Sequence, residues 1–180
     1  VLMSCMLLVI TGCSGHSKNL KFGAADIGGM YYSFASTFTQ LADKEIDGYT
    51  FETRTTAGSV ANLRLISDGY IDLAIVQADL LSDAYNATGA FTDKKYQKGY
   101  KAVASLYTEA CQIVVRNDSG ITSVDDLINK TVSVGASESG TEKNAEQILK
   151  MSGIADELIN KVNMDYTEAA AKLKNGDIDA

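Results

Sequence analysis

The chain of 180 residues carries a net charge of −7, from 23 acidic and 16 basic residues, and its lysines and arginines are scattered. A nucleic-acid surface is therefore not expected, because such surfaces gather basic residues. Only Cys111 lies beyond residue 13 and the one histidine is His16, which excludes a disulfide framework and argues against a His/Cys metal site in the folded part.

The N-terminal residues 1–12 form an uncharged, mostly apolar run. Its length suits the core of a signal peptide and is too short for a membrane span, which takes about 20 residues. The sequence Ile10-Thr11-Gly12-Cys13 resembles a bacterial lipobox, which ends on the cysteine that is lipidated. We expect a lipoprotein signal peptide at 1–12, lipidation at Cys13 and a flexible tether at 13–19. The alternative is a buried N-terminal strand or helix with an incidental cysteine.

From residue 20 the hydrophobic pattern predicts alternating strands and helices. Strands are expected at 20–25, 49–55 and 71–76, the last with the continuous apolar character of a buried parallel strand. Helices are expected at 31–43 and from a cap at Ser59 to a stop at Gly69. This βαβαβ order is followed by a polar surface connection at 86–100.

The second half of the chain again shows alternating strand and helix patterns. The pattern predicts a short helix opened by Ser123 and helices at 142–152 and 167–175. Strands are expected at 102–106, 112–116, 131–135 and 162–166. We therefore predict an α/β fold of two lobes, residues 20–106 and 107–180.

One short phrase occurs twice, 112 residues apart (134 minus 22). Phe22–Gly29 and Val134–Thr141 each read as strand, Gly-Ala, polar turn, Gly and helix. We interpret them as equivalent βα turns of the two lobes, whose helix N-termini attract anions. Together they predict a cleft that holds a small acid.

A second short sequence repeat, the Gly-x-Ile-Asp repeat, links Leu65–Ala74 with Leu173–Ala180. Both contain a helix end, then Gly, one residue and Ile-Asp. In the first copy a buried strand follows. By analogy we expect the chain as given to end inside a strand, with the fold incomplete at its C-terminus.

Enzyme motifs are missing from the sequence. It contains no G-x-S-x-G elbow, no phosphate loop ending in Gly-Lys-Ser/Thr, and no G-x-G-x-x-G fingerprint. Cys111 has no histidine partner beyond the tether, so a cysteine nucleophile is not expected. We predict that the protein is not an enzyme and uses no cofactor.

Several motifs in order resemble the TAXI-type solute-binding proteins of tripartite ATP-independent periplasmic (TRAP) transporters, over about residues 20–180. The resemblance implies a two-lobed, periplasmic-binding-protein type II-like fold and full-length members longer than this chain. The motifs that carry it are Gly28–Tyr32, Thr56–Leu63, Asp72–Asp79, Gln112–Arg116 with Asp118–Ile121, and Val134–Ala136 with Ser139–Glu142. Two positions depart from the family pattern: Ser33 replaces a frequent proline, and Glu138 replaces a small residue.

The resemblance also implies a function. The expected protein captures a small carboxylate ligand, a glutamate-like amino acid or an organic acid, and delivers it to a TRAP-type membrane permease. Its expected location is extracytoplasmic, lipid-anchored to the bacterial cell membrane. The alternative is a surface lipoprotein antigen or a ligand sensor that uses the same fold without transport.

The candidate ligand-binding residues come from the two turns, a third helix start, a strand end and the crossover between lobes. They are Gly28, Gly29, Tyr31, Tyr32, Gly58, Ser59, Gln77, Glu109, Ser137, Ser139, Gly140 and Thr141. Glycines admit a ligand to the backbone, and Tyr offers an apolar wall with a polar tip. Gln77 ends a buried strand at the edge where ligands of α/β sheets bind.

Some of these residues have structural alternatives. Ser139 or Thr141 could simply cap the helix, and Tyr31 could pack in the core. Glu109 could bind a ligand amine or be solvated. If Glu138 points into the cleft, the ligand should carry an amine, because a lone carboxylate there opposes an anion. If it points to solvent, its effect should be small and screened by salt.

Overall fold

The computed structural model describes residues 18–93 and 99–180. The expected signal peptide at 1–12 and Cys13 lie outside these residues, as does most of the expected tether. Within the described ranges no helix is both long and apolar enough to cross a bilayer.

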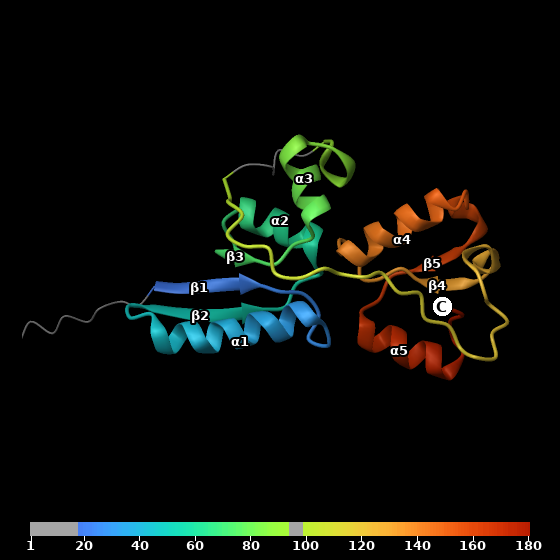
Figure 1. Cartoon of the computed structure of the whole chain (residues 1–180), viewed down its shortest axis with the longest axis horizontal. Helices are drawn as coiled ribbons and strands as arrows, with labels where there is room; N and C mark the ends of the chain where they lie inside the picture. The colour runs from blue at the N-terminus through green and yellow to red at the C-terminus, as the bar shows by residue number, and fades with distance from the viewer. Residues whose placement is uncertain (1–17, 94–98) are drawn as a thin grey trace, which may run out of the picture.

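Lobe I is built from the first six regular elements of the described chain. These are β1 (Lys18–Gly23), α1 (Met30–Glu45), β2 (Tyr49–Arg54), α2 (Ser59–Ser67), β3 (Leu73–Ala74) and α3 (Ala78–Asn86). The strands form a parallel sheet in the order β2-β1-β3. Helix α1 covers one face of this sheet, and α2 and α3 lie over the other (Figure 1). The βαβαβ order predicted for this half is therefore confirmed.

The core of lobe I has two parts, one on each face of the sheet. On the α1 side the buried residues are Phe22, Ala24, Ala35 and Ile75. On the α2 and α3 side they are Val60, Leu63, Leu80, Ala84 and Phe91. Aromatic packing extends the first part, because the ring of Phe38 meets the ring of Phe22 edge-on at 5.3 Å.

Lobe II is smaller and follows the same plan. Its regular elements are β4 (Thr131–Ser133), α4 (Gly140–Met151), β5 (Asn160–Val162) and α5 (Tyr166–Asn175). Strands β4 and β5 are parallel neighbours, and α4 and α5 lie on opposite faces (Figure 1). The short helix expected after Ser123 is a 3-10 turn at Val124–Leu127, and it begins with a capping box of Ser123 and Asp126. The buried core residues are Leu127, Val132, Val134, Leu149, Ile154 and Ile159.

The Gly-x-Ile-Asp repeat marks structurally equivalent positions in the two lobes. The N–H of Lys21 donates to Asp72 Oδ2 and the N–H of Asp72 donates to the Lys21 carbonyl, both at 2.9 Å. Thr131 and Asp179 make the same reciprocal pair, with both bonds at 2.8 Å. Residues 179–180 therefore lie beside β4 as β3 lies beside β1.

The spacing of the repeat is 110 residues, which corrects the 112 expected from the Gly-Ala pairs. The N–H of Gly29 donates to the Asp26 carbonyl at 3.0 Å, and the N–H of Ser139 donates to the Ala136 carbonyl at 3.1 Å, an offset of 110 (139 minus 29). The first Gly-Ala pair begins on the last residue of β1, whereas the second begins two residues after β4 ends. Identical dipeptides thus occupy different places in the two turns.

The strands predicted at 102–106 and 112–116 are wrong. Residues 100–116 cross between the lobes without regular secondary structure, and the Val103 side chain is 89% exposed. We call residues 99–116 the connector; it is the yellow segment of Figure 1. A segment of high β-propensity becomes a strand only where a neighbouring strand supplies backbone partners, and none among the described strands pairs with it.

Other element boundaries differ from the expectation. The strand expected at 162–166 is β5 at Asn160–Val162, and the one expected at 71–76 is reduced to β3. Helix α3 forms where the sequence pattern was not assigned to any element. Its two buried residues, Leu80 and Ala84, lie four positions apart, a helical signal too short to distinguish from a loop.

Candidate functional site

A cavity of about 710 Å³ lies between the lobes, at the carboxyl ends of the strands. Parallel α/β sheets bind ligands at this edge. The connector forms part of its wall. The expected site residues that line it are Gly29, Tyr31, Gly58, Ser59, Gln77, Glu109, Ser139, Gly140 and Thr141.

Three expected site residues do not line the cavity. Gly28 donates its N–H to Asp26 Oδ2 at 3.3 Å and belongs to the turn that leads to α1. Tyr32 packs against the lobe I core on the α1 side. Ser137 is exposed on the turn of lobe II.

The first turn leaves the N-terminus of α1 uncapped by side chains. Gly29 is the N-cap residue, with an extended backbone (φ −94°) and no side-chain hydrogen bond to the helix. Gly29, Met30 and Tyr31 all line the cavity. The first N–H groups of α1 are therefore suited to an anion, which the helix dipole also favours.

Tyr31 serves both as a core residue and as a cavity residue. Its ring packs against the lobe I core, while its hydroxyl donates to Glu109 Oε2 at 2.9 Å. Burial, with a smaller contribution from Glu109, raises the pKa of Tyr31 well above 10, so the hydroxyl stays a donor at neutral pH. Glu109 thus has a fixed partner, and its carboxylate is held at the cavity wall.

The second turn is capped by its own residues. Ser139 is the N-cap of α4, and its hydroxyl accepts from the N–H of Glu142 at 3.0 Å. The capping alternative for Ser139 is therefore what the structure shows, although Ser139 also lines the cavity. Thr141 shares a hydrogen bond with the Tyr166 hydroxyl at 2.7 Å. The Gly140 and Thr141 N–H groups, at the first positions of α4, are left for a ligand.

The third helix start differs from the expectation. Gly58, at φ +124°, is the N-cap of α2, so Ser59 is the first helical residue rather than the cap. The Ser59 hydroxyl, in a residue only 1% exposed, accepts the N–H of Gln77 at 3.1 Å. It thereby ties α2 to the end of β3, a positioning role within lobe I.

The side chain of Gln77 lines the cavity and lies beside Gly140 of lobe II. Its Oε1 atom is buried and has no hydrogen-bond partner among the described residues. A Cβ added to Gly140 would overlap this side chain. Glycine at position 140 therefore makes room for Gln77 at the N-terminus of α4.

Glu138 does not project its charge into the cavity. Its Oε2 atom accepts from Arg64 Nη2 at 2.7 Å, and its carbonyl accepts the N–H of Ala61 at 3.2 Å. Both partners belong to α2 in lobe I. The carboxylate is paired with an arginine across the lobes, so the condition under which Glu138 would require a ligand amine, a carboxylate pointing into the cleft, is not met.

Sequence reasoning missed the wall residues that follow β2 and β5. Thr55 and Thr56 come after β2, and Met164, Asp165 and Tyr166 come after β5. Part of the signal was available, because the residues that follow every parallel strand meet at one edge of the sheet. With the strand ends expected at 55 and 166, that rule would have found Thr56 but not the others, because the strands end earlier, at Arg54 and Val162.

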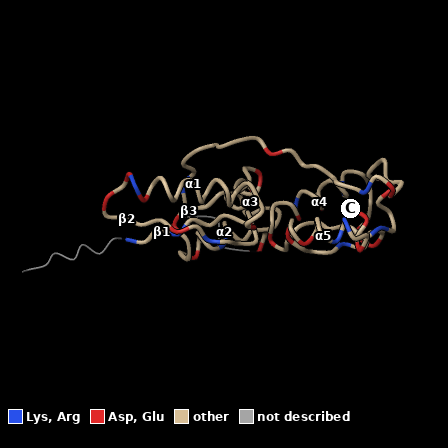
Figure 2. Tube along the Cα trace, turned by 90° about the horizontal axis from the view of Figure 1, so that it is seen from below, with Lys and Arg blue, Asp and Glu red and all other residues tan. Residues whose placement is uncertain are grey.

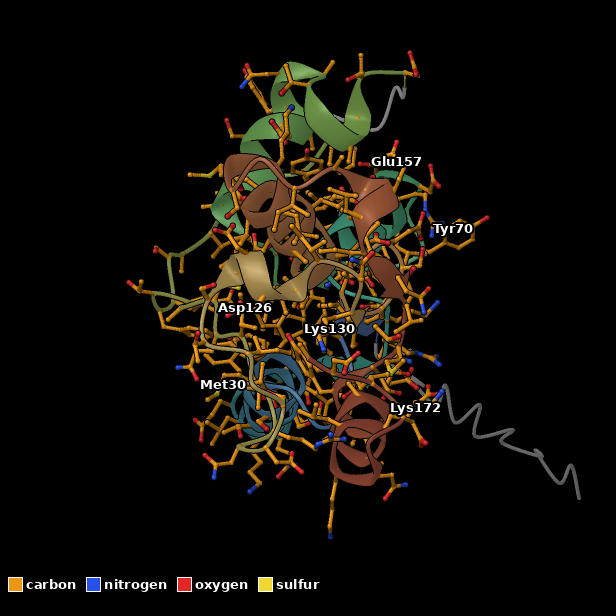
Figure 3. The ribbon with its side chains drawn as sticks, turned by 90° about the vertical axis from the view of Figure 1, so that its right-hand side faces the viewer. Met30, Tyr70, Asp126, Lys130, Glu157 and Lys172 are labelled. Carbon is orange, nitrogen blue, oxygen red and sulfur yellow. The ribbon has the colours of Figure 1, made fainter. Side chains whose placement is uncertain are left out.

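The charged side chains of the cavity lining among the described residues are Asp26, Glu109 and Asp165, all acidic. Basic residues are distributed along both lobes instead (Figure 2), and Lys172 of α5 lies toward the periphery in the view along the long axis (Figure 3). No group of three or more His, Cys, Asp or Glu within residues 18–93 and 99–180 could hold a metal ion. An anion in this cavity would be held by backbone N–H groups and hydroxyls.

A second cavity of about 520 Å³ lies within lobe II, between α4, α5 and the connector. Its lining is mostly aliphatic, including Val114, Ile148 and Leu173. Its charged lining side chains are Arg116 and Lys174. Because most of its wall is apolar, it fits a small polar solute less well than the cavity between the lobes.

Comparisons with known proteins agree with this architecture. The sequence model of the NMT1-like family matches residues 22–180. The alkanesulfonate-binding protein SsuA from Xanthomonas axonopodis pv. citri, solved with MOPS, is similar with a TM-score of 0.56 and 14% identity, over 89% of this chain and 52% of that one. The periplasmic aliphatic sulphonate-binding protein SsuA from Escherichia coli gives 0.51 and 18%, over 90% and 52%.

These structures share the fold of this chain at low identity. The predicted α/β fold of the periplasmic-binding-protein type is confirmed, and the chain spans about half the length of the solved proteins that it matches. At these identities the solved structures show the fold alone, and neither they nor the family model single out the TAXI type.

Proposed function

The chain belongs to the NMT1-like family, and from that premise we propose that it is an extracytoplasmic solute-binding protein that captures a small carboxylate ligand for a membrane transporter. The observation that carries the proposal is the cavity between the lobes, into which the N-termini of α1 and α4 both open. Two helix N-termini on separate lobes suit a ligand that is held by both. Binding would then favour the closed arrangement of the lobes.

The chemistry of the lining supports an amino acid over a plain dicarboxylate. Asp26, Glu109 and Asp165 are the charged lining groups among the described residues. A plain dicarboxylate such as succinate would bring two uncompensated negative charges to them, whereas the ammonium of an amino acid such as glutamate offsets one. An α-amino acid offers one carboxylate for a helix N-terminus and an ammonium for Glu109. Sulfonates, which the solved SsuA proteins are named for binding, present the same kind of anionic oxygens and are the direct competitor.

The proposal has two further parts, the type of the transporter and the membrane anchor. The TAXI resemblance supports a TRAP-type permease as the partner, and the lipobox supports attachment to the cell membrane through Cys13. A single acyl chain anchors weakly, so stable attachment requires more than one. A surface antigen or ligand sensor remains the alternative, and a gene for a large membrane permease beside or fused to this one favours transport.

A ligand panel tests the proposal. The thermal stability of the protein should be measured with L-glutamate, succinate and ethanesulfonate, because a ligand at 100 times its Kd stabilises by about 2.7 kcal/mol. We expect stabilisation by L-glutamate to exceed that by succinate. A preference for ethanesulfonate contradicts the carboxylate assignment, and no response to any small anion, amino acid or sugar contradicts solute binding itself.

For the anchor, labelled fatty acid should be followed in bacteria that express the precursor. We expect label on the protein with Cys13 and none on Cys13→Ala, with Cys111→Ala as the matched control that keeps its label. Equal labelling and membrane attachment of Cys13→Ala contradict the lipobox.

A further inference from the structure

Helix α2 has an N–H group satisfied from the other lobe. The third helical residue, Ala61, has no intrahelical acceptor, because the first N–H groups of any helix lack one. It donates instead to the carbonyl of Glu138 in lobe II at 3.2 Å. The next N–H, of Asn62, closes the first helical hydrogen bond within lobe I, to Gly58 at 2.8 Å.

The side chain of the same residue holds the same helix. Glu138 Oε2 accepts from Arg64 Nη2 at 2.7 Å, with the two side chains 38% and 33% exposed. Ala61 and Arg64 are three positions apart on α2 and therefore share a face. One residue of lobe II thus contacts α2 twice, through its carbonyl and through its carboxylate.

The backbone around this contact is shaped to permit it. Glu138 has φ +63°, a left-handed conformation that is uncommon outside glycine, and its N–H donates to Glu142 Oε2 at 3.0 Å. Gly58 approaches so closely that a Cβ on it would lie 3.2 Å from the Cα of Ser139. These contacts involve protein atoms alone.

We propose that the Glu138 contacts with Ala61 and Arg64 form a clasp that holds the two lobes together on the α2 side without ligand. Closure in a solute-binding protein is ordinarily assigned to the ligand; here part of its free energy is built into the chain. The clasp raises the fraction of binding-competent protein, and the apparent affinity rises with that fraction. Only this effect on ligand affinity rests on the proposed function; the contacts between the lobes do not.

Amide hydrogen exchange of the ligand-free protein tests the clasp at a single atom. We expect the Ala61 amide to exchange at least about 10-fold more slowly than an uncapped helix N-terminal amide, because its hydrogen bond exists only while the lobes touch. Glu138→Gln and Arg64→Met should each accelerate Ala61 exchange by about 2- to 5-fold, the range for a partly exposed ion pair. The double variant should add little beyond either single change.

Two controls keep the test decisive. The Asn62 amide reports on α2 itself and should keep its rate in all variants, which separates loss of the clasp from unfolding of the helix. Lys161→Met removes an ion pair confined to lobe II, with Asp156 at 2.8 Å, and should leave Ala61 unchanged. An unprotected Ala61 in the original protein, or variants that do not alter its rate, overturns the clasp. Since no ligand is present, such a failure leaves the solute-binding proposal standing.

Discussion

The two βα turns share a backbone and differ in what their side chains do. Each closes with a hydrogen bond across three residues, Gly29 to Asp26 and Ser139 to Ala136. In lobe I no side chain caps the following helix. In lobe II the Ser139 hydroxyl caps α4, and the neighbouring Glu138 binds α2 across the lobes.

The difference separates two uses of the same local fold. The lobe I turn keeps its helix N–H groups open to the cavity, as a ligand subsite requires. The lobe II turn commits one helix N–H to its cap and its glutamate to the other lobe, so that fewer groups remain for the ligand. We therefore expect lobe I to provide more of the ligand contact and lobe II to provide more of the closure.

The largest expected effect is at the point where the lobes meet. Gly140→Val would place a branched side chain in the space of Gln77 and would prevent both closure and ligand contact with α4. We expect the affinity for L-glutamate to fall by at least about 100-fold, equal to about 2.7 kcal/mol. Calorimetry checks this, with Gln147→Val on the exposed side of α4 as the control. Similar affinities for the two variants remove lobe II from the site.

Making the first turn resemble the second should weaken binding next most. Gly29→Ser supplies a hydroxyl that can cap α1 and compete with the ligand for the same N–H groups. We expect an affinity loss of about 10-fold, since charge-assisted hydrogen bonds are worth about 1.5–3 kcal/mol each. The free energy of unfolding should change by only a few tenths of a kcal/mol, because Gly and Ser are both good caps. Unchanged affinity would show that the ligand does not use α1.

A smaller effect is expected from the hydrogen bond between Thr141 and Tyr166. Thr141→Val and Tyr166→Phe should each lower the free energy of unfolding by about 0.5–1.5 kcal/mol. The double variant should lose about as much as one single variant, because both remove the same bond. Denaturant unfolding of the four proteins gives the coupling free energy. Strict additivity of the two losses contradicts the bond.

The smallest effect concerns acid stability and involves lobe II alone. Hydrogen bonds from Thr122 and Ser123 lower the pKa of Asp126 to about 2. A depressed folded-state pKa contributes stability that is present above the unfolded value near 4 and is lost as the pH falls toward 2. We expect Asp126→Asn to remove this part of the acid dependence, measured by unfolding between pH 5 and 2. A carbon NMR titration that gives Asp126 an ordinary pKa contradicts the prediction.

The sequence predicts most of what depends on local pattern. Helices α1, α4 and α5 follow from apolar spacing and caps. The Gly-x-Ile-Asp repeat correctly identified positions that make matching hydrogen bonds in the two lobes. The connector shows the limit, because β-rich residues at 102–106 and 112–116 become strands only with a partner strand. Local pattern also could not place the repeat exactly in register, since a Gly-Ala pair carries no information on where a strand ends.

Most of what the sequence did not predict about the site depends on contacts between residues that are distant in the chain. Arg64 and Glu138 are 74 positions apart, and nothing in either neighbourhood marks them as partners. Tyr31 lines the cavity and also packs against the core, and its bond to Glu109 depends on the path of the connector. Glu138 was singled out as a departure from the TAXI pattern, but only the folded chain shows that it contacts Ala61 and Arg64 of the other lobe.

Amide chemical shifts during a ligand titration test the central claim most directly. With L-glutamate, or the best ligand of the panel, the account predicts large shifts at the N–H groups of Met30 and Tyr31 in α1 and of Gly140 and Thr141 in α4. The N–H of Tyr85, near the C-terminal end of α3 and away from the lining residue Gln77 at its N-cap, should change little. Shifts confined to one lobe, or gathered around Ile148 and Leu173 in the apolar cavity of lobe II, contradict a ligand held between the two helix N-termini.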